Sequence, residues 1–512
     1  MIVVSRGVGL SAILAAVLGA VTAFSFAPFN FSFLPMVTFA GLIFLWRRAT
    51  TKFESTVIGL AFGLGVFCTG MRWIYVSLHD FGGMPGSVAI LCTFLLSLVL
   101  ACFAALTGYF QALLPTRVRL HSFVAIPALW ALFEWLRGWV LTGLPWLSLG
   151  YAQAADGPLA GYAPLLGVFG VSLVTALGAS LIASLLVATF ERNGSAMMLA
   201  AATIGALFGI SLYLAKIEWT APIGAPISVS LLQGNITQDI KWKPETIEST
   251  LITYRDLALS SKSKLIVMPE TAFPVFLEQM PPDYIAEIAD HAKKLGSDLL
   301  IGVPETTGPN IYHNSVVSLG TAPRQTYRKS HLVPFSEIIP LKWLIGWVYD
   351  DLLNMPLSDF TAGDTAQKPF AVAGQKIAMT NCYEDLFGEE IIRKLPDATL
   401  LANVSNDAWF GRSWGPQQHA QIAQMRALET GRYMVRATNT GVTAIIDQKG
   451  RIVTRAPEFT TMALNGTAQG FSGATPYVRA GNYGVVALSI TMLVGAIAFG
   501  RYRSQRQDLS LN

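Results

Sequence analysis

Long apolar stretches separated by short polar loops fill the first 215 residues of the chain. An α-helix needs about 20 mostly apolar residues to cross a bilayer. Seven stretches of this kind come first, and an eighth follows near the C-terminus. The predicted spans are residues 9–27, 31–46, 56–78, 87–114, 123–141, 159–190, 196–215 and 483–499. The pattern therefore predicts a membrane α-helical bundle of about eight transmembrane helices.

The pattern changes between the seventh and eighth spans, where short β-branched runs alternate with amphipathic stretches. Strands are predicted at Ile227–Gln233, Leu265–Pro269, Leu299–Val303, Ser315–Leu319, Ile377–Asn381, Leu400–Ser405 and Gly441–Ile446. Helices are predicted at Asp283–Leu295 and Gln417–Ala427. This alternation is typical of a layered α/β domain with its own core. We therefore expect membrane helices in residues 1–218, an inserted α/β domain in residues 221–478, and a final helix with a tail in residues 480–512.

The basic residues indicate which way the helices cross the membrane. Lys and Arg gather in alternate loops, and short cytoplasmic loops are the ones that carry such an excess. The residues concerned are Arg6, Arg47, Arg48, Lys52, Arg117, Arg119, Arg192, Arg501, Arg503 and Arg506. Both termini are then expected inside and the inserted domain outside. An alternative is that Val21-Thr22-Ala23 ends a cleaved signal peptide, but losing the first span would upset this charge pattern.

Composition supports a membrane protein and argues against nucleic-acid binding. Of the 512 residues, 52% are hydrophobic and 13% are charged, whereas soluble domains carry roughly 25% charged residues. The net charge of +4 is modest, and Lys/Arg runs occur only beside the predicted spans. We therefore expect membrane lipids, and no nucleic acid, among the partners.

Three strand ends in the inserted domain carry residues that could do chemistry together. Glu270 follows the strand at Leu265–Pro269, Lys329 precedes a polar loop, and Cys382 follows the strand at Ile377–Asn381. Sites in layered α/β domains gather beyond the carboxyl ends of strands. Each residue alone has a plainer explanation, as a capping carboxylate, a surface charge or an inert core thiol. The three together favour a catalytic site.

The chemistry expected of these residues is acyl transfer through a cysteine nucleophile. A free thiol with a pKa near about 8.5 is mostly protonated at neutral pH, so it needs a base. Glu270 can take the proton, and Lys329 can stabilise the oxyanion of a tetrahedral intermediate. We find no metal cluster and no nucleotide-binding loop in the sequence. No cofactor or metal is therefore expected.

These residues resemble the motifs of the nitrilase superfamily, whose Glu-Lys-Cys triad lies on an αββα sandwich. The matching motifs are Pro269-Glu270, Arg328-Lys329 with His331-Leu332-Val333-Pro334-Phe335, and Asn381-Cys382-Tyr383-Glu384. With its membrane spans, the whole chain resembles the apolipoprotein N-acyltransferases. That resemblance also includes Phe133-Glu134-Trp135-Leu136-Arg137-Gly138, Gly143-Leu144-Pro145-Trp146 and Gln233-Gly234-Asn235.

The resemblance implies a role for each matching residue. Glu270 would be the general base, Lys329 the oxyanion stabiliser and Cys382 the nucleophile. Supporting roles would fall to Glu337, a second essential carboxylate, and to Tyr383 and Glu384 beside the nucleophile. Substrate-binding roles would fall to Trp242, Trp146 and Arg137. For the two tryptophans the alternative is anchoring at the membrane interface, where Trp is enriched, and Arg137 has the alternative of pairing with Glu134.

The resemblance also implies the substrates and the place of the reaction. The acyl donor would be a membrane phospholipid, preferentially phosphatidylethanolamine, and the acceptor the N-terminal amine of diacylglyceryl-cysteine in an apolipoprotein. The enzyme would lie in the bacterial inner membrane with a periplasmic catalytic domain and cytoplasmic termini. The segment Trp347–Phe360 would be a mobile arm or a packed core loop. Two rivals remain: a membrane-tethered amidase that transfers the thioester to water, and a non-enzymatic receptor that reuses the fold.

Overall fold

The computed structural model describes residues 6–114, 121–339 and 360–511. The chain divides into two compact units, which are described separately. A membrane unit takes its residues from Met1–Arg72, Ser87–Ile217 and Arg479–Asn512. An α/β unit takes its residues from Trp73–Gly86 and Glu218–Val478.

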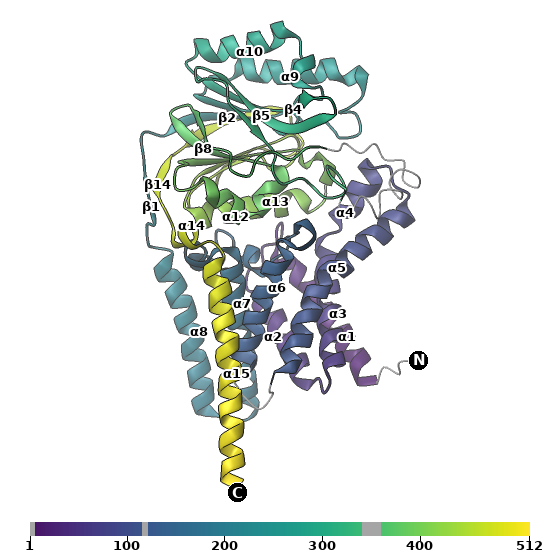
Figure 1. Cartoon of the computed structure of the whole chain (residues 1–512), viewed down its shortest axis with the longest axis vertical. Coiled ribbons are helices and arrows are strands. Elements are labelled where there is room, and N and C mark those ends of the chain that lie inside the picture. The colour runs from purple at the N-terminus through teal and green to yellow at the C-terminus, as the bar shows by residue number, and fades with distance from the viewer. Residues whose placement is uncertain (1–5, 115–120, 340–359, 512) are drawn as a thin grey trace. The chain divides into compact units, whose positions relative to one another are not determined.

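The membrane unit consists of helices throughout its described part (Figure 1). Its main helices are α1 (Arg6–Thr22), α2 (Leu34–Arg48), α3 (Lys52–Gly70), α5 (Gly86–Leu113), α6 (Ile126–Arg137), α7 (Ala163–Phe190), α8 (Gly194–Leu214) and α15 (Tyr483–Leu511). Five described segments are long and apolar enough to cross a membrane, namely Gly7–Ser25, Lys52–Gly70, Gly86–Leu113, Ala160–Phe190 and Gly194–Leu214. Helices α2 and α6 have 15 and 12 residues and the apolar part of α15 is Tyr483–Phe499, so the count of eight spans stays a prediction.

Small residues allow close contact between α1 and α3. A Cβ atom on Gly19 would lie 2.0 Å from the carbonyl oxygen of Phe62, and one on Gly65 would lie 2.1 Å from that of Ala16. Both distances are far inside van der Waals contact, so neither site has room for a side chain. Apolar helices in a membrane associate through this kind of close backbone packing.

The predicted third span is wrong at its C-terminal end. Helix α3 ends at Gly70, and the following helix α4 (Trp73–Val76) belongs to the α/β unit. The Trp73 ring packs edge-on at 4.5 Å against Phe410, and Ser77 Oγ donates a hydrogen bond to the carbonyl of Trp409 at 2.8 Å. The apolar run continues through this point, and the sequence does not show that its last part packs on a loop more than 300 residues away.

The α/β unit contains two six-stranded sheets. The first has, in spatial order, β13 (Met462–Ala468), β2 (Ile227–Gln233), β3 (Leu265–Val267), β4 (Asp298–Gly308), β5 (Ile311–Gly320) and β6 (Thr326–Arg328). The second has β12 (Ile452–Arg455), β11 (Ala444–Ile446), β10 (Met434–Thr438), β9 (Leu400–Ser405), β8 (Gln375–Asn381) and β7 (Phe370–Val372). A short antiparallel pair joins β1 (Thr220–Pro222) to β14 (Phe471–Gly473).

The two sheets face each other and helices cover their outer faces (Figure 1). One buried core contains Val229 and Leu300 of the first sheet together with Ile377 and Val404 of the second. Helices α9 (Pro244–Ser260) and α10 (Pro282–Lys294) cover the first sheet, whereas α12 (Gly388–Ile391), α13 (Gly415–Thr430) and α14 (Pro476–Ala480) lie on the side of the second. This αββα arrangement confirms the predicted fold class.

All seven predicted strands are present, β2 and β9 with the predicted ends and the others with shifted ends. The described residues also form seven strands that were not predicted, namely β1, β6, β7, β10, β12, β13 and β14, and the central strand β10 shows why. Its sequence, Met434–Thr438, carries Arg436, and a charged residue interrupts the apolar pattern on which strand prediction rests. In the structure Arg436 is fully buried because it pairs with Asp385 and Asp407, at 3.0 Å in each case. The tertiary partners therefore make a buried charge acceptable in a central strand.

Candidate active site

The strand order brings the predicted triad residues together from two sheets. Strands β3 and β4 are parallel, and β5 and β6 are each antiparallel to the preceding strand, so β3 and β6 end at the same edge. Glu270 follows β3 and Lys329 directly follows β6, whereas Cys382 directly follows β8 of the other sheet. Interactions between these side chains then show that the three meet.

Lys329 lies between two buried carboxylates. Its Nζ is 3.2 Å from Glu270 Oε1 and 2.9 Å from Glu337 Oε2. Asn314 also links the two acids, because its Nδ2 donates to Glu270 Oε1 at 2.8 Å and to Glu337 Oε1 at 2.9 Å. All four side chains are buried, so the charges interact with little screening by water.

The charges of this cluster hold Glu270 in its ionised form. Burial alone would raise the pKa of Glu270, but the Lys329 ammonium and the hydrogen bond from Asn314 outweigh it and lower that pKa below its ordinary value. Burial lowers the pKa of Lys329, yet the two carboxylates raise it well above its usual range. The site therefore rests with an ionised glutamate that is ready to accept a proton.

Cys382 is held in an unusual backbone conformation beside that glutamate. Its φ of 53° lies in the left-handed region, which costs a non-glycine residue about 1–3 kcal/mol. Asn403 donates to the Cys382 carbonyl at 3.2 Å, and Ser405 Oγ lies 3.2 Å from Sγ. The Cys382 side chain is also hydrogen-bonded to Glu270. The contacts around the cysteine thus hold it at the base.

The thiol needs this base. Burial, followed by the negative charge of Glu270, raises the pKa of Cys382 well above its ordinary value, and Lys329 opposes the rise. Cys382 is therefore a neutral thiol at rest. It would become a nucleophile if Glu270 took its proton, which is the chemistry of general base catalysis.

Glu384 connects the loop after Lys329 to the turn that carries Cys382 through hydrogen bonds. One carboxylate oxygen accepts hydrogen bonds from the backbone N–H groups of Ser330 and His331, at 2.7 and 3.1 Å. The other accepts from Tyr327 Oη and from the Asn381 N–H, at 2.7 Å each. Glu384, predicted as a supporting residue, therefore holds the segments that carry Lys329 and Cys382 to each other.

The other residues next to the nucleophile form an aromatic cluster. The Tyr383 ring lies 5.1 Å from Phe387 and 5.6 Å from His331, and the His331 ring stacks on Phe387 at 3.7 Å. His331 Nδ1 is 2.9 Å from Glu390. These contacts keep His331 against Phe387 and Glu390, which agrees with choosing Glu270 as the base.

Sequence reasoning missed a buried ion network behind the nucleophile. His419 Nδ1 lies 2.9 Å from Asp407, its Nε2 lies 2.9 Å from Asp385, and Arg436 bridges the same two acids. Ser405 Oγ donates to Asp407 at 2.7 Å. The network thus reaches the residue that contacts the cysteine sulfur. Its members lie far apart in the chain, and the one available signal was polar residues inside otherwise apolar strands.

The ion network of His419, Asp385, Asp407 and Arg436 supports the Cys382 site and does not suit a metal ion. Ligand atoms of Cys382, Asp407 and His419 lie within 4.8 Å of one another. Burial and Arg436 lower the pKa of His419, but Asp385 and Asp407 outweigh them and raise it to about 9. A protonated imidazole has no free lone pair for a metal ion. The residues present therefore do not fit a metal centre at neutral pH.

Comparison with known proteins identifies the family of this chain. The family model described as apolipoprotein N-acyltransferase N-terminal domain matches residues 18–181, and the one described as carbon-nitrogen hydrolase matches residues 228–469. An apolipoprotein N-acyltransferase from Nitrosomonas europaea is 52% identical over 94% of this chain and 96% of its own length. The chain belongs to the apolipoprotein N-acyltransferase family.

A second sequence relative belongs to the same family, and a solved structure shows a weaker likeness. The apolipoprotein N-acyltransferase from Chromobacterium violaceum is 44% identical over 96% of this chain and 94% of its own length. The crystal structure of a carbon-nitrogen hydrolase from Helicobacter pylori G27 is 19% identical, with a TM-score of 0.35, and covers 47% of this chain and 88% of that one. As an apolipoprotein N-acyltransferase the chain is an acyltransferase with a carbon–nitrogen hydrolase domain and membrane helices.

Two residues predicted to bind substrate lie inside the membrane unit of this N-acyltransferase. Arg137 donates to the carbonyls of Leu144 and Trp146, at 2.7 Å each, and to Ser148 Oγ at 3.0 Å. Trp146 is buried. Arg137 thus binds the loop that carries Trp146, and a role of either residue in binding substrate stays a prediction.

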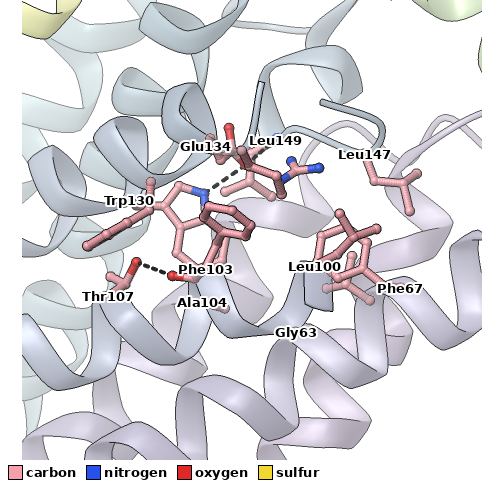
Figure 2. A pocket seen from close by; sticks show the side chains of 13 residues that line it. Gly63, Phe67, Leu100, Phe103, Ala104, Thr107, Trp130, Glu134, Leu147 and Leu149 are labelled. Carbon is pink, nitrogen blue, oxygen red and sulfur yellow. Dashed lines mark hydrogen bonds between the residues drawn. The ribbon is translucent and has the colours of Figure 1, made fainter. Parts of the chain in front are cut away.

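A small cavity lies beside this loop (Figure 2). Glu134 borders it and accepts hydrogen bonds from Trp130 Nε1 and from the Leu149 N–H, at 2.9 Å each. The cavity has a volume of about 20 Å³, which leaves room for roughly one water molecule. The cavity is therefore too small for a lipid chain in this conformation.

The third residue predicted to bind substrate, Trp242, is exposed and lies on the loop after β2 in the α/β unit. This position is compatible with a substrate contact. The predicted arm at Trp347–Phe360 lies outside the described residues apart from Phe360, which forms a β-bridge with Tyr312. The arm therefore stays a prediction.

Proposed function

We propose that this N-acyltransferase moves a fatty acyl chain from a membrane phospholipid to the N-terminal amine of diacylglyceryl-cysteine in an apolipoprotein. The chain would pass through a thioester on Cys382, and the reaction would be the last step of bacterial lipoprotein maturation. The observation that carries the proposal is the meeting of an ionised Glu270, the Lys329 ammonium at 3.2 Å and the Cys382 thiol.

The first half-reaction forms the thioester. Glu270 takes the thiol proton of Cys382 while Sγ bonds to the carbonyl carbon of the phospholipid ester. The carbonyl oxygen becomes an oxyanion, which the Lys329 ammonium stabilises. The carbon–oxygen bond to glycerol then breaks, Glu270 returns the proton to the departing oxygen, and a lysophospholipid leaves.

The second half-reaction forms the amide. The amine of the acceptor attacks the thioester carbon and passes a proton to Glu270. The carbon–sulfur bond breaks, and the departing sulfur of Cys382 recovers that proton. Because each product leaves before the next bond forms, one difficult transfer becomes two easier steps, and the kinetics are ping-pong.

The surface of the α/β unit supports an amphiphilic donor such as phosphatidylethanolamine. Four large apolar side chains are exposed, each within two residues of a buried charged group: Trp242, Phe335, Ile338 and Trp409. Exposed apolar side chains of this kind can contact acyl chains.

We also propose that the protein spans the inner membrane with its α/β unit in the periplasm and both termini in the cytoplasm. The basic loops support this orientation. A phosphatase reporter inserted at Pro309, in the turn between β4 and β5, is expected to be active outside the cytoplasm. A reporter placed after Asn512 is expected to be inactive, with a fusion at Thr50 as the cytoplasmic control. Activity at the C-terminus and none at Pro309 would reverse the topology.

Incubating the enzyme with a defined phospholipid is expected to load one acyl group on Cys382. Thioesters are cleaved by neutral hydroxylamine, so mass spectrometry should find the acyl mass on the peptide that carries Cys382 and lose it after that treatment. Adding a diacylglyceryl-cysteine peptide should move the chain to its amine.

The matched control is Cys382→Ala, which should carry no acyl group and yield no N-acylated peptide. An acyl group on another residue, or none, would contradict the thioester route. Free fatty acid as the main product would support an amidase that uses water. Unchanged cellular function of Cys382→Ala would support a receptor.

A further inference from the structure

A second buried lysine lies at the proposed reaction centre and was not expected from the sequence. Lys241 is on the loop after β2, and 2% of its surface is exposed. Its Nζ donates a hydrogen bond to Thr271 Oγ1 at 2.8 Å. Thr271 directly follows the proposed base and has a left-handed φ of 43°, so this bond fixes the lysine beside Glu270.

Burying an ammonium group is costly unless opposite charges compensate. Burial lowers the pKa of Lys241 to about 8, and the negative charges of Glu270 and Cys382 act against that decrease. These are the two groups between which a proton moves in the proposed first step. The charge of Lys241 therefore acts on both the donor and the acceptor of that proton.

The cluster of Glu270, Glu337 and Lys329 has two acidic side chains and one basic side chain, so a second lysine would balance its charge. Lys329 by itself serves two carboxylates, Glu270 and Glu337. Asp407, which also raises the pKa of the Cys382 thiol, is already paired with Arg436 and His419. Lys241 thus brings a second cation to a group that otherwise has one cation for two acids.

An aromatic neighbour shields this cation from solvent. Lys241 Nζ lies 5.9 Å from the centroid of the Trp242 ring, within the range of a cation–π contact. The ring itself is 50% exposed. The two adjacent residues therefore have opposite environments, an inward ammonium and an outward ring.

We propose that Lys241 is a positioning residue of the active site, a second cation that keeps Glu270 ionised and favours negative charge on the Cys382 sulfur. This inference rests on the proposed function, in which Cys382 is the nucleophile. Lys241 acts through these two groups by its charge.

The test measures the reactivity of Cys382 without any lipid. Iodoacetamide reacts with the thiolate, so its rate of reaction with Cys382 is followed from pH 7 to 11 by mass spectrometry of the Cys382 peptide. Lys241→Met removes the charge and keeps the length of the side chain. The pKa of Lys241 is about 8, so its charge is present at pH 7 and lost above about pH 9. We expect the rate in Lys241→Met to be about tenfold lower than in the wild type at pH 7, and the two rates to converge above about pH 9.

Two further variants separate charge from packing. Lys241→Arg keeps the charge and should keep most of the wild-type rate at pH 7, and Lys243→Met changes an exposed lysine on the same loop and should leave the profile unchanged. If Lys241→Met does not fold, Lys241→Gln carries the same test, because its amide can still donate to Thr271.

An unchanged rate at pH 7 in folded Lys241→Met, or an equal decrease at every pH, would overturn the proposal. An equal decrease at pH 7 in Lys243→Met would also overturn it. Because alkylation needs no phospholipid, a failure of acyl transfer itself would appear in the acyl-trapping experiment and not here.

Discussion

Replacing Glu270 with glutamine is expected to slow thioester formation by roughly 10²–10⁴-fold, the usual contribution of a general base. The thiol at rest is protonated, because burial raises the pKa of Cys382 well above its ordinary value. An amide cannot take that proton. The rate is measured as acyl-enzyme formed in a single turnover with excess phospholipid.

The same variant should remain folded. Glu270 Oε1 accepts from Lys329 and Asn314, and Oε2 accepts from the Asn406 N–H at 2.9 Å. The amide nitrogen of glutamine would face one of these donors, which costs about 1–3 kcal/mol. Glu305→Gln is the matched control, since Glu305 is a buried carboxylate paired with Arg328. Near-normal acyl-enzyme formation in Glu270→Gln would exclude this glutamate as the base.

Replacing Lys329 with methionine is expected to abolish acyl transfer and to destabilise the α/β unit by about 3–5 kcal/mol, the usual cost of leaving a buried charge unpaired. The variant loses the cation that we propose stabilises the oxyanion. It also leaves two buried carboxylates, Glu270 and Glu337, linked through the same Asn314 amide. The measurement is the thermal unfolding temperature in detergent, with acyl-enzyme formation in parallel.

The stability loss should depend on pH in a defined direction. In the wild type the folded pKa of Glu270 is lowered, so its stabilising contribution is present above the pKa of an unfolded glutamate, about 4.3, and is lost as the pH falls. Without Lys329 that folded pKa should rise above the unfolded value, and the variant should gain stability as the pH falls. The difference between the two proteins should therefore be largest near neutral pH and shrink towards pH 4.

Lys394→Met provides the control for that dependence. Lys394 is also buried, and its Nζ donates to the Met379 carbonyl at 2.6 Å. Burial lowers the pKa of Lys394 more than Glu384 and Glu390 raise it, whereas the two carboxylates beside Lys329 raise the pKa of that lysine. Removing Lys394 should therefore show a smaller change in cost between pH 7.5 and pH 4.5 than removing Lys329. A Lys329→Met deficit that is constant over this range would mean that the two carboxylates are not coupled through the lysine.

Predictions from the sequence succeeded where a local pattern carries the information. Apolar β-branched runs marked the predicted strands, and the polar residues directly after them included Glu270 and Cys382. They failed at strand β10 because buried Arg436 has partners that are distant in the chain. They also failed at residues 73–78, the end of the predicted span 56–78, where the apolar run packs on the loop at Trp409 and Phe410.

By itself, the amino-acid order determined the membrane class, the layered α/β domain and the choice of the three residues proposed as the triad, because periodicity and strand ends are properties of neighbouring residues. Only the tertiary structure decided that Lys329 pairs with two carboxylates and that Asn314 donates hydrogen bonds to both of them. It also decided that the ion pairs of His419 lie behind the Cys382 sulfur, and that the charge of Lys241 acts on Glu270. Each of these depends on charges that become close, and strongly coupled, only when the fold removes the water between them.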